Sequence, residues 1–335
     1  MKILLTGAAG FIGSALAIRL LDRGDTVVGV DNHSNYYDTS LKEARLLRHI
    51  DHDNYSHERI DICNKKLLDE VFNLHKPKCV VNLAAQAGVR YSSLNPLECI
   101  NTNIIGFANI LEACRYHKIE HLVYASSSSV YGANTKLPFS IHDNSNHPLS
   151  IYAASKKSNE LLAHTYSNLY QIPTTGLRFF TVYGPWGRPD MALFKFTKSI
   201  LAGEPIDVFN NGNHYRDFTY IDDIIEGLTN VIDHQAKRDT NWRSYDPDPA
   251  SSCAPWRIYN IGNNKPVNLL EYISMLETEL GVSAKLNYLP LQQGDLPDTY
   301  ADITDFAEQF NYIPMTSVQI GIRKFVNWYR NYYKI

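Results

Sequence analysis

The sequence has few cysteines, no excess of charge of either sign and no long apolar run. Its five cysteines (Cys63, Cys79, Cys99, Cys114 and Cys253) show no CxxC spacing, which argues against a disulfide framework and predicts no metal site. The 32 basic and 35 acidic residues give a formal net charge of −3, so the basic stripe of a nucleic-acid or membrane-surface protein is missing. Without a membrane span or a signal peptide, we expect a cytoplasmic protein.

Residues 2–31 contain the most informative pattern. The apolar segment 2–6 suits a buried parallel strand, and Gly7, Gly10 and Gly13 follow it at GxxGxxG spacing before a helical periodicity. Gly7 permits a sharp turn, Gly10 has no Cβ to block a pyrophosphate, and Gly13 lets the helix pack closely on the strand. Because a helix N-terminus also offers N–H groups to a phosphate, the pattern predicts a dinucleotide site.

A second apolar strand, 26–30, ends on Asp31. A carboxylate at this point can accept hydrogen bonds from an adenosine ribose, and its charge repels a 2′-phosphate. The sequence therefore predicts NAD rather than NADP as the dinucleotide.

Strand and helix patterns alternate through the first half of the chain, which predicts an α/β fold with a Rossmann-type, doubly wound parallel sheet. The predicted strands are 2–6, 26–30, 57–62, 79–83, 121–125 and 174–179, and the helices include 41–50, 65–74, 98–117 and 152–170.

The alternation ends near residue 184, where Pro, Gly and Asn become frequent. We expect a first domain over 1–180, to which 217–233 return as a helix, and a smaller mixed α/β lobe over 181–216 and 234–335. The segment 234–256 is rich in Asp, Ser and Pro without periodicity, which predicts an exposed loop.

Tyr152 and Lys156 stand four residues apart on a predicted helix, so both side chains project from one face. A phenol with a pKa near ~10 is a poor base at neutral pH, and a nearby ammonium favours the phenolate. The preceding strand ends in a serine run, 126–129, where hydroxyls can meet a ligand at the carboxyl edge of the sheet. There are two purely structural alternatives: the tyrosine and the lysine merely share a helix face, and the serine run is a turn that caps the next segment.

Together these motifs resemble the extended short-chain dehydrogenase/reductase superfamily, within it the nucleotide-sugar 4-epimerases, and most closely the UDP-glucuronate 4-epimerases. The resemblance spans nearly the whole chain. Besides the residues above, it is carried by AAQAGVRYS at 84–92, SSSSVYG at 126–132, LRFFTVYGPWGRPDMA at 177–192, RDFTYIDD at 216–223, APWRIYNIG at 254–262 and QQGDLPDTYAD at 292–302.

The resemblance implies a role for each matching position. Tyr152 would be the base, Lys156 would hold the nicotinamide ribose and tune Tyr152, and Ser127 would assist proton transfer. The cofactor-binding residues would be Gly7, Gly10, Phe11, Ile12, Gly13, Asp31, Asn32, Asp61, Ile62, Leu83, Ala84, Ala85, Gln86, Asn103, Tyr152 and Lys156. The UDP-sugar would meet Arg90, Ser127, Ser128, Ser129, Thr181, Arg188, Val208, Phe209 and Arg216.

The reaction implied is 4-epimerisation of UDP-glucuronate to UDP-galacturonate through a 4-keto sugar, with NAD retained and regenerated in each turnover. Related dehydratases and UDP-glucuronate decarboxylases carry acids just before the VYG segment, whereas this chain has Ser127, Ser128 and Ser129 there. These hydroxyls and Thr181 could hold the carboxylate out of alignment for its loss as carbon dioxide.

Four alternatives remain open: a UDP-glucose or UDP-N-acetylglucosamine 4-epimerase, a UDP-glucuronate decarboxylase, a reductase that exchanges its cofactor, and a non-catalytic NAD-binding regulator. The GPWGRPDMA segment and the run Gln292, Gln293, Gly294, Asp295 favour a uronate substrate over a neutral hexose. The long helices 98–117 and 152–170 resemble those that pair into a homodimer interface in this superfamily.

Overall fold

The computed structural model describes residues 1–291 and 298–335. The chain divides into two compact units. The first comprises Met1–Thr135, Ser140–Phe179 and Ile225–Asn260, and the second Lys136–Phe139, Phe180–Ile224 and Ile261–Ile335. No helix within these described residues is long and apolar enough to cross a lipid bilayer.

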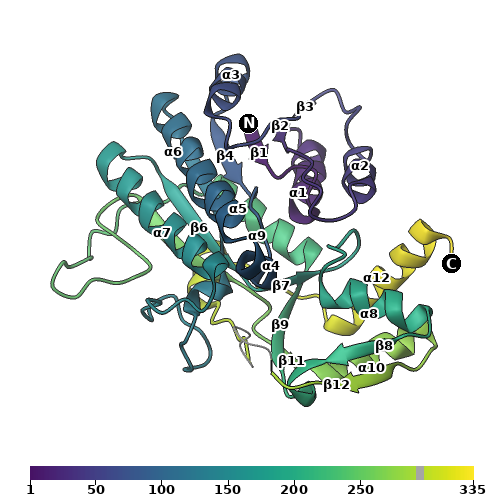
Figure 1. Cartoon of the computed structure of the whole chain (residues 1–335). Helices are drawn as coiled ribbons and strands as arrows, with labels where there is room; N and C mark the ends of the chain where they lie inside the picture. The colour runs from purple at the N-terminus through teal and green to yellow at the C-terminus, as the bar shows by residue number, and fades with distance from the viewer. Residues whose placement is uncertain (292–297) are drawn as a thin grey trace. The chain divides into compact units, whose positions relative to one another are not determined.

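Among the described residues, the first unit is built on a seven-stranded parallel sheet in the order β10-β6-β5-β4-β1-β2-β3 (Figure 1). Ile3 of β1 pairs with Val27 on one side and Cys79 on the other, which places β1 in the middle of the sheet. Its strands are β1 (Lys2–Thr6), β2 (Thr26–Val30), β3 (Tyr55–Glu58), β4 (Cys79–Asn82), β5 (His121–Ser127), β6 (Thr174–Phe179) and β10 (Trp256–Ile261).

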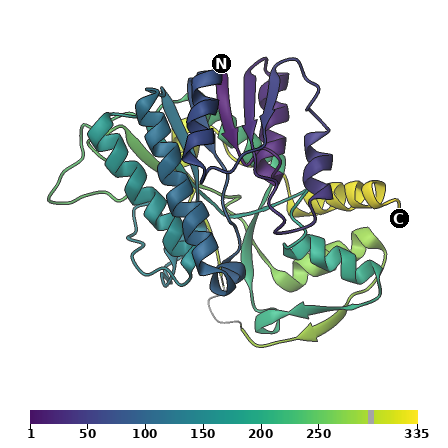
Figure 2. The same cartoon turned by 45° about the horizontal axis from the view of Figure 1, so that its top comes forward.

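Helices cover both faces of this sheet, so its central strands are apolar on both sides (Figures 1 and 2). One core joins the strands to α3 (Lys65–His75), α6 (Phe107–Tyr116) and α7 (Ile151–Tyr170). Ion pairs tie α1 (Phe11–Asp22) to α9 (Ile221–Asp233), from Arg19 to Glu226 and from Arg23 to Asp233. The shorter elements are α2 (Ser40–Leu46), α4 (Val89–Leu94), α5 (Pro96–Ile100), the π-helical turn η1 (Asn101–Gly106) and the 3-10 turn η2 (Ser128–Tyr131).

The predicted elements are largely confirmed, with one strand misplaced. The strands at 2–6, 26–30 and 174–179 have their predicted bounds, and the helix at 152–170 begins one residue earlier, where Ser150 caps the N–H of Ala153. The strand predicted at 57–62 is wrong: β3 is Tyr55–Glu58, because its pairing starts at Val27 with Tyr55. The helix predicted at 98–117 is a succession of α5, η1 and α6.

The domain boundaries also need correction. Residues 234–260, expected in the second lobe, belong to the first unit. The physical reason is β10, which adds to the large sheet beside β6 and holds the preceding loop through the hydrogen bond from Ile258 N–H to the Ala250 carbonyl. Conversely, 217–224 belong to the second unit, since Asp217 and its neighbours lie in β9 (Tyr215–Tyr220) of a separate sheet.

The second unit contains small sheets in the orders β11-β9-β7 and β12-β8. The buried Asp217 carboxylate accepts the backbone N–H groups of Asn263, Asn264 and Ala301, and so ties three segments together. The elements are β7 (Thr181–Tyr183), α8 (Ala192–Leu201), β8 (Pro205–Val208), η3 (Phe209–Gly212), β11 (Pro266–Asn268), α10 (Leu269–Leu280), β12 (Lys285–Tyr288), α11 (Thr304–Phe310) and α12 (Val318–Tyr333).

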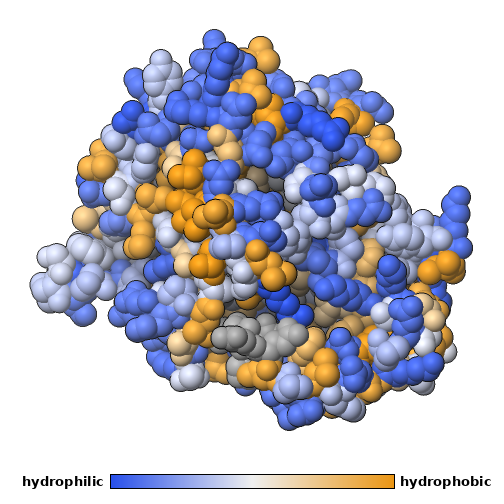
Figure 3. Space-filling view, in the orientation of Figure 1, coloured by the Kyte–Doolittle hydropathy of each residue, from blue (hydrophilic) through white to orange (hydrophobic). Residues whose placement is uncertain are grey.

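Apolar side chains gather on the surface of the first unit over α4, α5, α6 and α7 (Figure 3). Leu97 and Leu161 are 78% and 61% exposed, and Leu94, Ile105 and Leu169 are exposed as well. A contiguous apolar surface marks an interaction site more often than singly scattered apolar residues do.

Candidate active site

The turn between β1 and α1 has the form that the glycines predict. Gly7 has φ +70°, and a Cβ on it would lie 2.9 Å from the Ala84 nitrogen. A Cβ on Gly13 would overlap the Gly7 carbonyl oxygen. Gly10 is the N-cap of α1 and, within the described residues, no side chain caps the helix. The N–H groups of the first turn, which includes Phe11 and Ile12, therefore point to an anion site.

Asp31, at the end of β2, is buried and faces this turn. Its Oδ2 accepts the Ala9 N–H at 3.0 Å, its Oδ1 accepts the His33 N–H at 2.8 Å, and the Lys42 ammonium lies 3.9 Å from Oδ1. A carboxylate offers about four acceptor positions, so these bonds orient Asp31 while leaving capacity for ribose hydroxyls.

Asn32 and Asp61 form a hydrogen-bonded polar pair at the same edge of the sheet as Asp31. Asn32 Nδ2 donates to Asp61 Oδ2 at 2.8 Å, and the Cys63 N–H donates to Asp61 Oδ1 at 2.8 Å. Partial burial opposes ionisation, but these hydrogen bonds hold the pKa of Asp61 below its usual range. The side chain of Ile62 is buried, and a Cβ on Gly106 would lie 2.8 Å from its Cδ1, so the two residues need this close approach.

Residues 83–86 lie beside the glycine turn, and Asn103 holds them in place by hydrogen bonds. Asn103 Oδ1 accepts the Gln86 N–H at 2.8 Å and Asn103 Nδ2 donates to the Gln86 carbonyl at 3.1 Å, while Thr6 Oγ1 accepts the Ala84 N–H at 3.1 Å. Leu83 and Ala85 are half-buried. Gln86 Nε2 is buried without an acceptor among the described residues. A buried amide donor without a partner, next to a glycine cradle, fits a polar cofactor.

Tyr152 and Lys156 lie on α7 as the spacing predicts. The Lys156 ammonium is 5.9 Å from the centre of the Tyr152 ring and donates to the Ala125 carbonyl at 2.9 Å. Burial lowers the pKa of Lys156 to about 8. The Tyr152 N–H donates to Ser92 Oγ at 3.1 Å, which ties the start of α7 to α4. Desolvation strengthens the field of the ammonium, so this pair can favour a phenolate.

The serine run turns sharply at the end of β5. Ser127 Oγ donates to Ser129 Oγ at 3.1 Å and accepts the Ser129 N–H at 3.2 Å, and Ser128 begins η2. Gly132 follows with φ +53°, where a Cβ would overlap the His147 carbonyl oxygen. This packing explains the glycine of the VYG segment. The hydroxyls thus stand at the carboxyl edge of the sheet, where α/β proteins bind ligands.

The remaining substrate candidates divide between the units. Arg90 is exposed on α4 in the first unit. In the second unit, Arg188 donates from Nε and Nη2 to the two carboxylate oxygens of Asp190, Thr181 is half-buried on β7, and Arg216 Nη1 donates to the Tyr215 carbonyl at 3.3 Å.

Val208 and Phe209, two of the predicted UDP-sugar contacts, differ in accessibility. Val208 is fully buried and its carbonyl accepts the Leu289 N–H, so of the two only Phe209 has a partly exposed side chain. Gln292, Gln293, Gly294 and Asp295 lie outside the described residues.

Sequence reasoning missed Ser155 and Asn159, two polar residues that bind the predicted Asn103. Asn103 Nδ2 also donates to Ser155 Oγ at 3.0 Å, and Asn159 Nδ2 donates to the Asn103 carbonyl at 2.7 Å. Asn103 lies in the π-helical turn η1, a geometry that is frequent at functional sites. Ser155 and Asn159 follow Tyr152 at three and seven residues, so helical spacing was the available signal.

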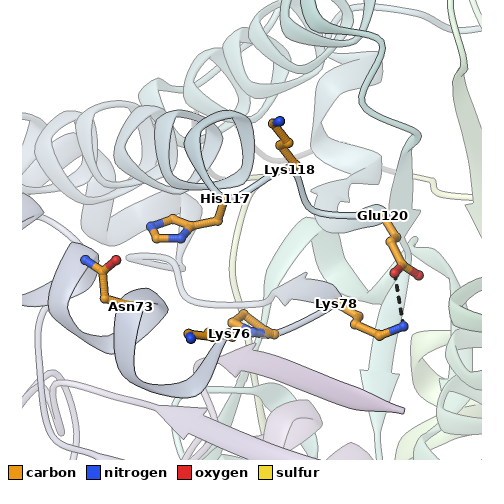
Figure 4. A pocket seen from close by; sticks show the side chains of 7 residues that line it. Asn73, Lys76, Lys78, His117, Lys118 and Glu120 are labelled. Carbon is orange, nitrogen blue, oxygen red and sulfur yellow. Dashed lines mark ion pairs between the residues drawn. The ribbon is translucent and has the colours of Figure 1, made fainter.

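A cavity of about 360 Å³ lies at the opposite, amino edge of the large sheet (Figure 4). It is lined by Asn73, Lys76, Lys78, His117 and Lys118, with Lys78 paired to Glu120 at 3.2 Å. Lys76 and His117 are the C-caps of α3 and α6, and the positive Lys76 complements the negative end of the α3 dipole, whereas burial lowers the pKa of His117. The cavity contains none of the predicted site residues.

The chain is similar to known proteins over its whole length. A profile of the NAD dependent epimerase/dehydratase family matches residues 3–262. Protein CapI of Staphylococcus aureus is 56% identical over 334 residues, which is 100% of both chains. UDP-glucuronate 4-epimerase 2 of Arabidopsis thaliana is 46% identical over 339 residues, covering 100% of this chain and 77% of the relative. The crystal structure of UDP-glucuronic acid 4-epimerase from Bacillus cereus, in complex with UDP-glucuronic acid and NAD, has a TM-score of 0.86 and 33% identity over 99% of this chain and 100% of that one.

Proposed function

The chain belongs to the NAD dependent epimerase/dehydratase family, and from this premise we propose that it is a UDP-glucuronate 4-epimerase. As an NAD-dependent nucleotide-sugar epimerase, it would interconvert UDP-glucuronate and UDP-galacturonate. The observation that carries the reaction type is the acid-free serine turn, 127–129, together with an intact Tyr152 and Lys156, and the GPWGRPDMA segment at 184–192 favours the uronate as substrate. Full-length similarity to UDP-glucuronate 4-epimerases supports the same assignment.

The first-unit residues fit NAD. The cradle at Gly7 and Gly13 has no room for a Cβ, Asp31 has acceptor capacity toward a ribose, and Gln86 Nε2 is a buried donor that lacks an acceptor among the described residues. NAD, when bound, supplies the group that takes up and returns the C4 hydride. Because the reaction has no net redox change, we propose that NAD stays bound through each turnover.

In the proposed mechanism, Tyr152 accepts the proton of the C4 hydroxyl and later returns it. Lys156 lowers the cost of the phenolate by its charge, and its hydrogen bond to the Ala125 carbonyl fixes that charge in place. Ser127 relays the proton between the sugar and the phenol. The sugar turns about its diphosphate linkage between the two half-reactions, so the second face is reduced and C4 is inverted.

The 4-keto uronate is a β-keto acid, so the site must also protect its carboxylate. Loss of carbon dioxide is fast only when the breaking bond is aligned with the keto group. The hydroxyls of Ser127, Ser128 and Ser129 would bind the carboxylate in another orientation. No acid is present in this turn to help expel a leaving group, which disfavours a decarboxylase or a dehydratase.

We also propose a cytoplasmic homodimer formed through the ranges 98–117 and 152–170. Ile105 on the first range, Leu161 and Leu169 on the second, and Leu97, which lies one residue before the first range, are exposed on the apolar surface described above. All five cysteines are among the described residues and none forms a disulfide, in keeping with a reducing compartment. Sedimentation of the protein and of a Leu97→Glu/Leu161→Glu variant would test the dimer, which the variant should dissociate.

The function is tested by following UDP-glucuronate by proton NMR without added NADH. Formation of UDP-galacturonate supports the proposal, and Tyr152→Phe should abolish it while the protein stays folded. A UDP-pentose with release of carbon dioxide would indicate a decarboxylase instead. Turnover of UDP-glucose or UDP-N-acetylglucosamine, but not of UDP-glucuronate, would assign the protein to a neutral substrate.

A further inference from the structure

A buried ion pair lies beneath the catalytic candidates and takes no part in the mechanism above. Arg178, on β6, binds Glu160, on α7, through two parallel hydrogen bonds: Nε to Oε1 at 2.9 Å and Nη2 to Oε2 at 3.0 Å. Both side chains are almost entirely buried. A charge pair in the interior is costly to desolvate and is retained only where its geometry is well satisfied.

Glu160 has further contacts with β5 and with its own helix, and Lys157 extends them to a neighbouring segment. Ser126 Oγ donates to Glu160 Oε1 at 2.6 Å, and Lys157 Nζ donates to Oε2 at 3.2 Å and to Ser145 Oγ at 3.0 Å. The carboxylate therefore has four donors, which matches its acceptor capacity. The pKa of Glu160 falls to about 2, because the Arg178 charge and these hydrogen bonds outweigh its burial.

The sheet register brings this pair next to the serine turn. Ser126 pairs with Arg178 across β5 and β6, so both side chains lie on the same face and meet Glu160 there. Ser126 directly precedes Ser127. Glu160 is also one helical turn beyond Lys156, whose ammonium binds the carbonyl of Ala125. Two adjacent residues of β5 thus bind α7 directly.

Arg178 also supports the far end of the turn. Its guanidinium carbon lies 4.8 Å from the centre of the Tyr131 ring, and the Tyr131 hydroxyl donates to Asn260 Oδ1 at 2.7 Å. Tyr131 is the last residue of η2, which begins at Ser128. One guanidinium therefore contacts both the helix that carries Tyr152 and the turn that carries the catalytic serine.

We propose that Glu160 and Arg178 are positioning residues, whose ion pair sets the Tyr152 phenol and the Ser127 hydroxyl at the spacing needed to act on one substrate hydroxyl. The proposal rests on the proposed function, because it assigns both groups to the same proton transfer. A misplacement of about 1 Å between reacting groups can cost about 100-fold in rate without weakening binding.

A variant that lacks both charges distinguishes the effect of lost positioning on kcat from the effect of an unpaired buried charge on stability. Glu160→Gln and Arg178→Met should each lower the Tm, since each leaves a buried charge unpaired. The double variant Glu160→Gln/Arg178→Met should regain most of the Tm, yet its kcat for UDP-glucuronate should stay about 10- to 100-fold below the parent with KM within about twofold. Recovery of kcat together with Tm would overturn the proposal, as would a KM that rises by as much as kcat falls.

Two single variants keep the test decisive if the double variant does not fold. Ser126→Ala removes one bond to Glu160 and leaves the ion pair, so kcat should fall about fivefold while the Tm falls less than in either single charge variant. Asp25→Asn is the matched control, because Asp25 is also buried and binds two cations, Arg23 and the N-terminus, each at 2.6 Å. It should lower the Tm without changing kcat. Parental kcat in Ser126→Ala, or an equal loss in Asp25→Asn, contradicts the proposal.

A readout without turnover distinguishes this proposal from the proposed function. Tyrosine labelled with ¹³C at Cζ, with the Tyr152 signal assigned by Tyr152→Phe, reports the titration of Tyr152 in the protein without substrate. In the double variant, which has no change in net charge, the Tyr152 midpoint should move to higher pH because Lys156 is less well placed. An unchanged midpoint overturns the positioning role, whereas lack of UDP-glucuronate turnover by the parent protein overturns only the proposed function.

Discussion

The two edges of the seven-stranded sheet differ in how far their polar side chains are buried. At the carboxyl edge, Asp31, Asn103 and Lys156 are buried, and each is held by specific hydrogen bonds or close charges. At the amino edge, Lys78 and Glu120 form an ion pair although they are 64% and 52% exposed. The same parallel strands thus end in an ordered polar interior on one side and, apart from the buried Asp25, in a more solvated charged surface on the other.

This difference follows from what each edge must do. Burying a polar group is costly unless its partners are fixed, so a buried network marks a place where geometry matters. An exposed ion pair contributes little and needs no fixed geometry. The dipoles strengthen the contrast, because α1 points its N-terminus to the carboxyl edge while α3 and α6 end at the amino edge. We therefore expect substitutions at the carboxyl edge to affect chemistry and those at the amino edge to affect at most stability.

The largest effect is expected for Tyr152→Phe. Loss of the phenol removes the general base, so kcat should fall about 1000-fold while KM and Tm stay near the parental values. Steady-state kinetics with UDP-glucuronate and a thermal melt measure both. A kcat within about tenfold of the parent would assign the base to another residue.

Two glycine substitutions contrast the edges directly. Gly13→Ala places a Cβ on the Gly7 carbonyl and should cost about 3 kcal/mol and remove NAD from the purified protein. Gly24→Ala, at the amino edge, meets no atom within 4 Å and carries only the strain of φ +90°, about 1 kcal/mol. Urea unfolding and the NAD content of each variant provide the comparison. Loss of NAD from Gly24→Ala would contradict the difference between the edges.

The buried Lys156 should give stability a distinctive pH dependence. Burial lowers its pKa to about 8, so between about pH 8 and the ordinary lysine value near 10.4 the unfolded chain binds more protons than the folded chain. The unfolding free energy of the NAD-free parent should therefore rise across this window by up to about 3 kcal/mol relative to Lys156→Met. The exposed Lys118→Met is the control and should show no such difference. A flat difference for Lys156→Met would mean that Lys156 stays protonated throughout.

The smallest effect is expected for the amino-edge ion pair. Lys78→Ala removes the bond to Glu120, and we expect the unfolding free energy to change by less than about 1 kcal/mol with kcat unaffected. A tenfold loss of kcat would show that the amino edge is coupled to the site, and the comparison would fail.

Local patterns in the sequence predicted the parts of the site that depend on near neighbours. The glycine turn, Asp31 at a strand end and the spacing of Tyr152 and Lys156 are all local, and the structure places them as expected. The strand at 57–62 was misplaced because its register is set by pairing with β2, a tertiary contact. The segment 234–260 was misassigned because β10 joins the sheet beside β6, far away in the sequence.

The polar network could not be predicted because its bonds join distant segments. Asn103 binds Ser155, 52 residues away, and Ser126 binds Glu160, 34 residues away. For the ion pair, the visible signal was Arg178 within a buried strand, since a buried arginine needs an acidic partner. Nothing in the sequence alone identified that partner as Glu160.

The proposed site removes the C4 hydrogen and returns the same hydrogen to the other face of the sugar. UDP-glucuronate carrying deuterium at C4 tests this central step directly, with the product examined by NMR and mass spectrometry in the presence of unlabelled NADH. We predict that UDP-galacturonate forms with the deuterium still at C4 and with none in the solvent or in the added cofactor. Loss of the label from C4, or its appearance in the added cofactor, would contradict the proposed mechanism.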